Sequence, residues 1–333
     1  MPVYMKLKIV DFSAYKPSEV ISNKELENKI NADSTLVPSG MIEKIFGIKQ
    51  RRFAGENEQV SDLATKAAQP LLEKYDPKSI DLLIFASASS DLIEPATSNI
   101  IQHKLGLDCP VMDIKNACNS FVSALQVSSG LISTGQYKNI LLVTGEKLSD
   151  GIRYSFEDQK QLKNSFAAFS FGDAGSATLL SYSENGSSIP YQKFMSDGKF
   201  WELCTVKGGG SLHPHEDKNY FEGHTAALRN TIIEHAESFI KNCFKEANIL
   251  PSEIDHLFTH QVSMGIFKDV VEITEIPIEK CHIVFEEFGN TAASSIPLAM
   301  EKAKAKNELK RGQLILLIGM AAGISISFQL IRY

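Results

Sequence analysis

Short apolar runs recur along the chain and are bounded by turn residues. Apolar runs of roughly four to eight residues are typical of strands that are buried on both faces. They predict strands at residues 81–88, 111–114, 140–144, 177–182, 256–259 and 314–320. The alternating run at residues 324–331 predicts one more strand, which would lie at an edge or pair with the strand before it.

Between these strands, apolar residues recur at helical spacing. The pattern predicts helices at residues 61–74, 119–134, 226–248 and 291–304. Strands that alternate with helices indicate a layered α/β architecture.

Residues 183–220 interrupt this alternation, because they are rich in Gly, Ser and Pro. We expect this segment to connect two halves of the chain, residues 1–182 and residues 183–333. Its glycine run at 208–210 is expected to be a flexible loop, since no G-x-x-x-x-G-K-[ST] phosphate-binding motif is present.

The two halves resemble each other locally. In the first half, the predicted strand 111–114 runs through Asn116 and Cys118 into a helix. In the second half, a strand-like stretch at 283–285 runs through Asn290 into another helix. Each half therefore places a polar or reactive residue where a loop becomes a helix, as an internal duplication would.

The composition of the 333-residue chain, with 43% hydrophobic and 22% charged residues, is that of an ordinary globular protein. Its net charge of -6 and its lack of a long basic run argue against nucleic acid as a partner. No apolar stretch approaches the roughly twenty residues needed to cross a bilayer. The first ten residues also lack the apolar core of a secretory signal. We therefore predict a cytoplasmic protein with no membrane partner.

The cysteines are too scattered for a disulfide framework or a zinc site, because their number is odd and no C-x-x-C pair occurs. They are Cys109, Cys118, Cys204, Cys243 and Cys281. His213 and His215 lie at alternate positions, but no third ligand is in view, so we predict loop histidines and no metal.

Cys118 stands out because it lies just before the predicted helix 119–134. Unpaired N–H groups and the positive end of the helix dipole stabilise an anion there, which would lower the pKa of the thiol and make it a nucleophile. The alternative is a cysteine that is simply packed at a helix start.

His260 and Asn290 are the candidate partners of Cys118. His260 follows the predicted strand 256–259, at the strand end where open α/β sheets place their active sites. As a neutral imidazole it could donate or accept a hydrogen bond at a thioester carbonyl. The side-chain N–H of Asn290 could supply a second donor to an oxyanion or enolate. A structural histidine and a helix cap are the alternatives.

These residues and six motifs resemble β-ketoacyl-ACP synthase III, an initiating condensing enzyme of the thiolase superfamily. The motifs are GIKQRRFA at 47–54, NACNSF at 116–121, FGDAGSATLL at 171–180, THQVSMGI at 259–266, GNTAASSIPLAM at 289–300 and GMAAGIS at 319–325. They occur in the family's order and extend over nearly the whole chain.

The resemblance implies an α/β thiolase-like fold, with two pseudo-duplicated halves in a five-layered α-β-α-β-α arrangement, and a homodimer. It implies that Cys118 takes an acyl group, with an oxyanion hole made by the backbone N–H groups of Cys118 and Ala322. His260 and Asn290 would then bind a malonyl- or β-ketoacyl-thioester for Claisen condensation. Acyl-CoA or acyl carrier protein thioesters would be the substrates, with no permanently bound cofactor.

Departures from the family concern coenzyme A and the nucleophile loop. The tryptophan and arginine that clamp the adenine are replaced by Met41 and within residues 162–165, and a nearby arginine is replaced by Ile45. These changes favour an acyl carrier protein donor, or a coenzyme A that is held differently. The nucleophile loop reads C-N-S-F instead of C-S-G-F, which could alter the pocket entrance.

Glu94 stands where the family usually has an apolar residue that lines the partner's acyl pocket. A carboxylate is out of place against an acyl chain, and some relatives that join two acyl chains use a glutamate near this point as a base across the dimer. Glu94 is therefore a candidate cross-dimer base, which would suit polyketide-type or other secondary metabolism. A solvated loop carboxylate is the alternative.

Two other functions share this scaffold. One is an acyltransferase that moves the acyl group of Cys118 to an oxygen or nitrogen acceptor. The other is a non-catalytic subunit of a heteromeric synthase, but such subunits typically lose the Cys or His that this chain retains. HMG-CoA synthase and chalcone synthase also use Cys, His and Asn, and the synthase III motifs fit better.

Overall fold

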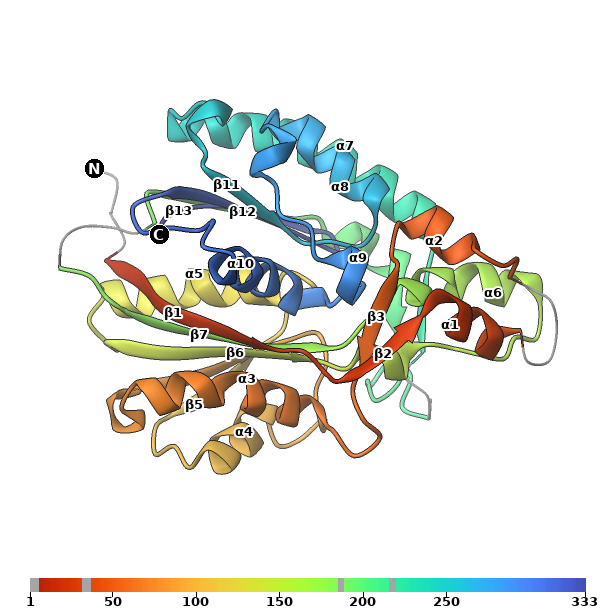
Figure 1. Cartoon of the computed structure of the whole chain (residues 1–333), viewed down its shortest axis with the longest axis horizontal. Coiled ribbons are helices and arrows are strands. Elements are labelled where there is room, and N and C mark those ends of the chain that lie inside the picture. The colour runs from red at the N-terminus through yellow and green to blue at the C-terminus, as the bar shows by residue number, and fades with distance from the viewer. Residues whose placement is uncertain (1–5, 32–36, 185–188, 216–219) are drawn as a thin grey trace.

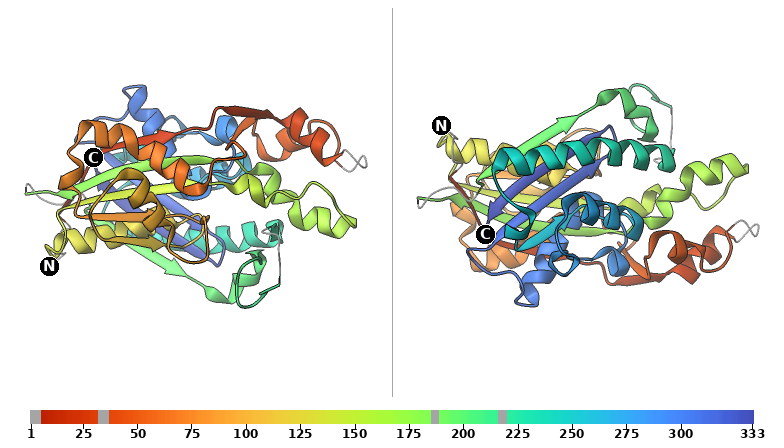
Figure 2. Two further views of the ribbon diagram at one scale, coloured as in Figure 1. Left: turned by 90° about the horizontal axis from the view of Figure 1, so that it is seen from below. Right: turned by 90° about the horizontal axis from the view of Figure 1, so that it is seen from above.

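Two β-sheets alternate with three layers of helices in the computed structural model, which describes residues 6–31, 37–184, 189–215 and 220–333 (Figure 1). Helices α5 (Ser120–Ser133) and α10 (Ser295–Ala305) lie between the sheets. The outer layers are α3 (Val60–Lys74) and α4 (Thr97–Leu105) on one side, and α7 (Thr225–Ala247) and α8 (Met264–Thr274) on the other. Figure 2 shows both outer layers face-on. The predicted five-layered α-β-α-β-α fold is confirmed.

The first sheet has the strand order β1-β7-β6-β4-β5. Its strands are β1 (Leu7–Tyr15), β4 (Leu82–Ala86), β5 (Val111–Ile114), β6 (Asn139–Glu146) and β7 (Ala174–Tyr182). β4 is parallel to both β5 and β6, whereas β7 is antiparallel to β6 and β1. Helices cover both faces, which explains why β4 and β6 are almost uninterrupted apolar runs.

The second sheet has the strand order β11-β12-β13-β8. Its strands are β8 (Tyr191–Ser196), β11 (His256–Thr259), β12 (Leu314–Ala321) and β13 (Ser325–Arg332). β13 pairs with both β12 and β8, so the predicted hairpin is confirmed but β13 is not an edge strand. β8 corrects the expectation that residues 183–220 only connect two halves. Within that segment, residues 185–188 and 216–219 lie outside the described part.

The predicted strand at 283–285 is wrong, because the chain there leads into the short helix α9 (Phe285–Phe288). The side chain of Gln261 explains the difference. Its Nε2 donates to the carbonyl of His282 at 2.6 Å, and its Oε1 accepts from the backbone N–H of Val284 at 2.8 Å. A side chain therefore satisfies backbone groups that a neighbouring strand would otherwise pair. Helix α10 likewise starts after a 3₁₀ turn, Ala292–Ser294, and so later than the predicted helix 291–304.

A lobe at one end of the layers packs around an apolar cluster that also includes Phe267 of α8 and Phe285 of α9 (Figure 1). We call it the α2–α6 lobe, and its elements are β2 (Glu19–Ser22), α1 (Asn23–Ile30), α2 (Met41–Phe46), β3 (Gln50–Phe53), α6 (Gln159–Ser165) and the 3₁₀ turn Phe166–Ser170. Nearby, β9 (Cys204–Val206) pairs with β10 (Phe221–Gly223). Among the described helices, none is long and apolar enough to cross a membrane.

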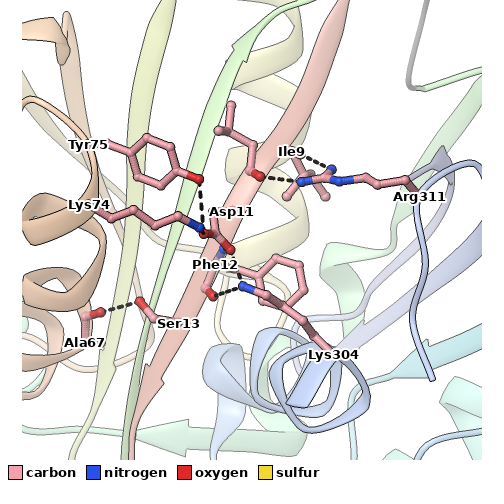
Figure 3. Close-up of polar contacts among 10 residues, drawn as sticks. Ile9, Asp11, Phe12, Ser13, Ala67, Lys74, Tyr75, Lys304 and Arg311 are labelled. Carbon is pink, nitrogen blue, oxygen red and sulfur yellow. Dashed lines mark hydrogen bonds and ion pairs between the residues drawn. The ribbon is translucent and has the colours of Figure 1, made fainter. Parts of the chain in front are cut away.

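Two basic residues of the second half of the chain bind residues of β1 in the first half (Figure 3). Lys304 forms an ion pair with the buried Asp11, and Arg311 donates to the carbonyl of Ile9 at 2.6 Å and to that of Val10. The register of β1 shifts between Ile9 and Asp11. Such a bulge leaves backbone groups without partners in the sheet, and Arg311 satisfies two of these carbonyls.

Replacing Asp11 by Asn is expected to lower stability most at neutral pH. Burial alone would raise the pKa of Asp11, but hydrogen bonds from Lys304 and Lys74 lower it from 3.8 to about 2. A carboxyl with a depressed pKa stabilises the fold above its unfolded pKa, and this stabilisation is lost as the pH falls from about 4 to about 2. The loss at pH 7 should be roughly 2 kcal/mol.

Urea unfolding of the wild type and the Asp11→Asn variant at pH 7 and pH 3 would measure this. We expect the wild type and the variant to differ less in unfolding free energy at pH 3 than at pH 7. A difference of the same size at both pH values would contradict the ion-pair argument. Glu237→Gln, which removes a surface ion pair with Lys241, is the control and should change stability far less.

Candidate active site

Cys118 lies in a tight turn between β5 and α5 and is half-buried. Ala117 has a φ of 46°, in the left-handed region that residues with a Cβ rarely adopt. Ser120 holds this turn, since its hydroxyl donates to the carbonyl of Ala117 at 2.6 Å and accepts from the backbone N–H of Asn116 at 2.8 Å. The turn presents the sulfur just before the first turn of α5, as the sequence predicted.

The expected lowering of the Cys118 pKa is wrong. Burial, with a smaller contribution from the negative charge of Glu146, raises the pKa of the thiol to about 12. The cost of burying a thiolate therefore outweighs the helix-start effect. Cys118 is a protonated thiol at neutral pH, so its reaction with a thioester needs a group that accepts the proton.

His260 follows β11 directly, at the carboxyl end of the strand, and only 4% of it is exposed. Burial lowers the pKa of its imidazole to about 4, so the ring is neutral at neutral pH. Its Nδ1 lies 2.9 Å from the hydroxyl of Ser295, which also lies 2.8 Å from the carbonyl of Ala292. The hydroxyl can donate to either atom, so His260 can carry its proton on Nε2 or on Nδ1.

Asn290 lies between α9 and the 3₁₀ turn Ala292–Ser294, and it is buried. Its Oδ1 accepts from the backbone N–H of Ala292 at 3.0 Å, which leaves its amide N–H groups for a ligand. Its backbone is also fixed, because its N–H donates to Ser170 at 2.7 Å and its carbonyl accepts from Gly172 at 3.0 Å. Ala292 thus contacts both Asn290 and the Ser295–His260 pair.

Glu146 is a buried carboxylate that the sequence analysis missed. It ends β6 and accepts hydrogen bonds from the backbone N–H groups of Ala88 at 2.8 Å, Ser89 at 3.2 Å and Ala293 at 3.3 Å. The hydroxyl of Ser89 donates a further bond at 2.8 Å. Burial raises the pKa of Glu146 to about 7 in spite of these donors. A carboxylate directly after a buried apolar strand was the signal that could have revealed it.

The structure brings Cys118, His260 and Asn290 to one region through a chain of contacts. The charge of Glu146 acts on Cys118, and the carboxylate of Glu146 binds the turn Ala292–Ser294. Ala292, the first residue of the same 3₁₀ turn, contacts both His260 and Asn290. Residues from both halves of the chain are therefore linked through Glu146 and one turn.

Ala322 and Glu94 occupy different surroundings. Ala322 lies half-buried in the turn that joins β12 to β13. Glu94 is exposed on the loop between β4 and α4, beside Leu92 and Ile93, which are 52% and 78% exposed. Within the described residues, no hydrogen bond or ion pair connects Glu94 with Cys118.

The positions that clamp adenine in the family belong to the α2–α6 lobe. Met41 is half-buried and packs against its apolar cluster, while Ile45 is 45% exposed. The rings of Phe46 and Phe166 stack with centroids 5.6 Å apart and join α2 to the turn that follows α6. Aliphatic and phenyl groups thus pack between α2 and the turn that follows α6.

No group of three or more His, Cys, Asp or Glu residues is arranged to hold a metal ion in the described part of the chain. His213 and His215 are both exposed.

Comparison with known proteins matches both halves of the site. The family 3-oxoacyl-[acyl-carrier-protein] synthase III matches residues 112–198, and its C-terminal family matches residues 244–333. The β-ketoacyl-[acyl-carrier-protein] synthase III of Aliarcobacter butzleri is 31% identical, with 96% of each chain covered. That of Rickettsia bellii is 29% identical, with 99% of this chain and 100% of the relative covered.

Solved structures agree. The 3-oxoacyl-[acyl-carrier-protein] synthase III of Aquifex aeolicus is 29% identical, with a TM-score of 0.86, over 98% of this chain and 100% of that one. Xanthomonas campestris OleA, at 23% identity over 99% of this chain and 97% of that one, shares the fold with a TM-score of 0.88.

The fold and the site together define a condensing enzyme of the thiolase superfamily. Within that class, the chain belongs to the β-ketoacyl-[acyl-carrier-protein] synthase III family. It is a transferase that joins acyl thioesters by Claisen condensation in fatty-acid or related biosynthesis. The family and the fold that the six motifs predicted are confirmed.

Proposed function

We propose that Cys118 carries the acyl group and that His260 and Asn290 activate the second thioester. The observation that carries this proposal is the turn Ala292–Ser294, which contacts Asn290 directly and His260 through Ala292 and Ser295. Two neutral side chains are thereby connected to the same turn. Neutral donors stabilise an enolate without transferring a full proton to it too early.

In the first half-reaction, the sulfur of Cys118 attacks the carbonyl carbon of the donor thioester. The backbone N–H groups of Cys118 and Ala322 stabilise the oxyanion. Because the Cys118 pKa is high, its proton passes to Nε2 of His260 and then to the departing carrier thiolate. The acyl group remains a thioester and keeps its transfer potential.

In the second half-reaction, a malonyl-type thioester loses carbon dioxide and becomes an enolate. Nε2–H of His260 and the amide of Asn290 donate to its oxygen, and its carbon attacks the acyl carbonyl on Cys118. Cys118 leaves as a thiolate and takes a proton from solvent. His260 therefore accepts a proton at Nε2 in the first half-reaction and donates a hydrogen bond from Nε2 in the second. The hydroxyl of Ser295 permits both states, because it can donate either to Nδ1 of His260 or to the carbonyl of Ala292.

The partners follow from the family and from the sheet. We propose acyl carrier protein and coenzyme A thioesters as substrates, no permanently bound cofactor, a cytoplasmic location, and two functional halves, residues 1–182 and 183–333.

A homodimer is supported by β5, which ends the first sheet and has one edge without a partner strand in the described chain. Acyl carrier protein is favoured over coenzyme A because Met41 and the Phe46–Phe166 stack offer no planar cation for adenine.

We propose Glu94 as a base that each subunit supplies to its partner, where it would remove the α-proton of a second thioester that forms its enolate without decarboxylation. Its exposure supports this role, because the carboxylate is available to a second chain. If so, Glu94→Gln should load acyl groups at the normal rate but condense them roughly 100-fold more slowly, since a positioned base contributes about 10²–10⁴-fold. Single-turnover condensation of preloaded enzyme measures this. Equal condensation rates for the variant and the wild type would leave Glu94 as a solvated loop carboxylate.

Intact-protein mass spectrometry tests the proposed function. The wild type is incubated with a panel of acyl-CoA and acyl-carrier-protein thioesters, and then with malonyl carrier protein. We expect a gain of one acyl group per chain, followed by its discharge as a β-ketoacyl product. Discharge only by an alcohol or an amine would indicate an acyltransferase. If no donor ever loads the enzyme, the non-catalytic subunit becomes the better hypothesis.

A further inference from the structure

Four polar side chains from the two halves meet beside the nucleophile turn. The amide of Asn119 donates to the hydroxyl of Ser325 at 2.9 Å, and the hydroxyl of Ser327 donates to Oδ1 of Asn119 at 2.8 Å. The amide of Asn116 donates to the same hydroxyl of Ser325 at 3.1 Å. Asn119, Ser325 and Ser327 are almost completely buried. We call these four residues the Asn–Ser clasp.

The backbone around the clasp is shaped to fit it. A Cβ at Gly319 of β12 would lie 1.9 Å from Oδ1 of Asn119, so this position has room only for glycine. The backbone N–H of Gly319 donates to the hydroxyl of Ser327 at 3.1 Å. Both ends of the Asn119 amide are therefore satisfied in the interior. A buried amide that lost these partners would cost about 1–3 kcal/mol.

The clasp residues lie close in sequence to the two groups that stabilise the oxyanion in the proposed function. Asn119 follows Cys118 directly, and Ser325 begins β13 three residues after Ala322. One half of the chain supplies one backbone N–H donor, and the other half supplies the second. No described sheet joins β5 to β13, because the two strands belong to different sheets. The hydrogen bonds of the clasp connect the segment after β5 with β13.

We propose that the Asn–Ser clasp is a positioning device that sets the separation of the oxyanion-hole donors, the N–H groups of Cys118 and Ala322. This proposal rests on the proposed function. An oxyanion hole works when its donors lie about 2.7–3.1 Å from the oxyanion, and an error of about 1 Å costs on the order of 100-fold in rate. The clasp side chains form no described hydrogen bond with the thiol of Cys118, so the clasp acts through the backbone on either side.

The kinetic signature follows from this geometry. The donors bind the oxyanion and not the ground-state thioester, so a loosened clasp should lower kcat and leave KM unchanged. Alkylation of Cys118 by iodoacetamide passes through no oxyanion. The clasp should therefore matter for acylation and not for alkylation.

The experiment compares Asn119→Ala, Ser325→Ala and Ser325→Thr with the wild type. We expect the two alanine variants to acylate Cys118 roughly 10- to 100-fold more slowly, with a donor KM within about twofold of the wild type. Their rate of alkylation by iodoacetamide should not change. Ser325→Thr keeps a hydroxyl and should recover most of the rate. Ser128→Ala, which removes a buried hydroxyl from α5 outside the clasp, is the matched control and should behave like the wild type.

Two results would overturn the proposal. One is wild-type kcat in a folded Ser325→Ala or Asn119→Ala variant, even if its melting temperature falls, because the clasp would then only stabilise the fold. The other is an equal loss of acylation and alkylation, which would place the defect at the thiol itself. Failure of the proposed function looks different, since the wild type would then take up no acyl group at all.

Discussion

A Cys118→Ala variant should take up no acyl group from any thioester. The alanine leaves no sulfur at the strained turn between β5 and α5. Cys204 is near enough for its charge to act on Cys118, but burial raises the pKa of the Cys204 thiol to about 12. Without the covalent intermediate, condensation should fall by at least about 10³-fold. Intact-protein mass spectrometry gives the loading, and product formation gives the turnover.

Cys109→Ala is the matched control for Cys118→Ala. Cys109 is a buried cysteine that precedes β5, and burial raises the pKa of its thiol. Its removal should leave loading at one acyl group per chain. Acyl uptake by Cys118→Ala, or its loss in Cys109→Ala, would assign the nucleophile to a different residue.

A His260→Ala variant should load Cys118 roughly 10²–10⁴-fold more slowly at pH 7, since it lacks the group that accepts the thiol proton. The pH dependence gives the sharper test. In the wild type, His260 has a pKa of about 4 and is neutral above pH 5, so the loading rate should be nearly constant from about pH 5 to pH 9. In the variant, only the thiolate reacts, and its fraction increases tenfold per pH unit toward the Cys118 pKa of about 12.

Stopped-flow loading between pH 6 and 9 distinguishes these profiles. A wild-type rate that itself increases tenfold per pH unit would show that Cys118 reacts as a free thiolate and that His260 does not accept its proton. His213→Ala, which changes an exposed loop histidine, serves as the control and should keep the flat profile.

Much of the fold could be predicted because apolar runs and helical spacing report burial directly. β4, β6 and β12 are continuous apolar runs covered on both faces, and each appears where the pattern indicated. β8 was missed because its residues are only partly buried and alternate poorly between apolar and polar. The strand predicted at 283–285 failed because Gln261, from a distant segment, satisfies its backbone.

The candidate site, like the fold, could be predicted only in part from the sequence. Cys118, His260 and Asn290 lie at loop boundaries that the sequence marks by itself, with family motifs around each. The direction of the Cys118 pKa and the clasp could not be predicted, because each depends on contacts across the chain. Asn119 and Ser325, for instance, are 206 positions apart, and nothing local in the sequence pairs them. The sequence shows the substitutions in the C-N-S-F motif, but it does not show which distant residues Asn119 binds.

The position of β13 along the chain has a consequence for synthesis on the ribosome. Cys118 emerges early, whereas Ala322 and Ser325 emerge about 200 residues later, which at about 5–20 residues per second takes roughly 10–40 s. During that interval Cys118 lacks the second oxyanion donor of the proposed function, and the apolar cluster that both halves share is incomplete. If Cys118 and Ala322 act as proposed, the nascent chain should therefore acquire acyl groups only slowly until β13, the last strand of the second sheet, is in place.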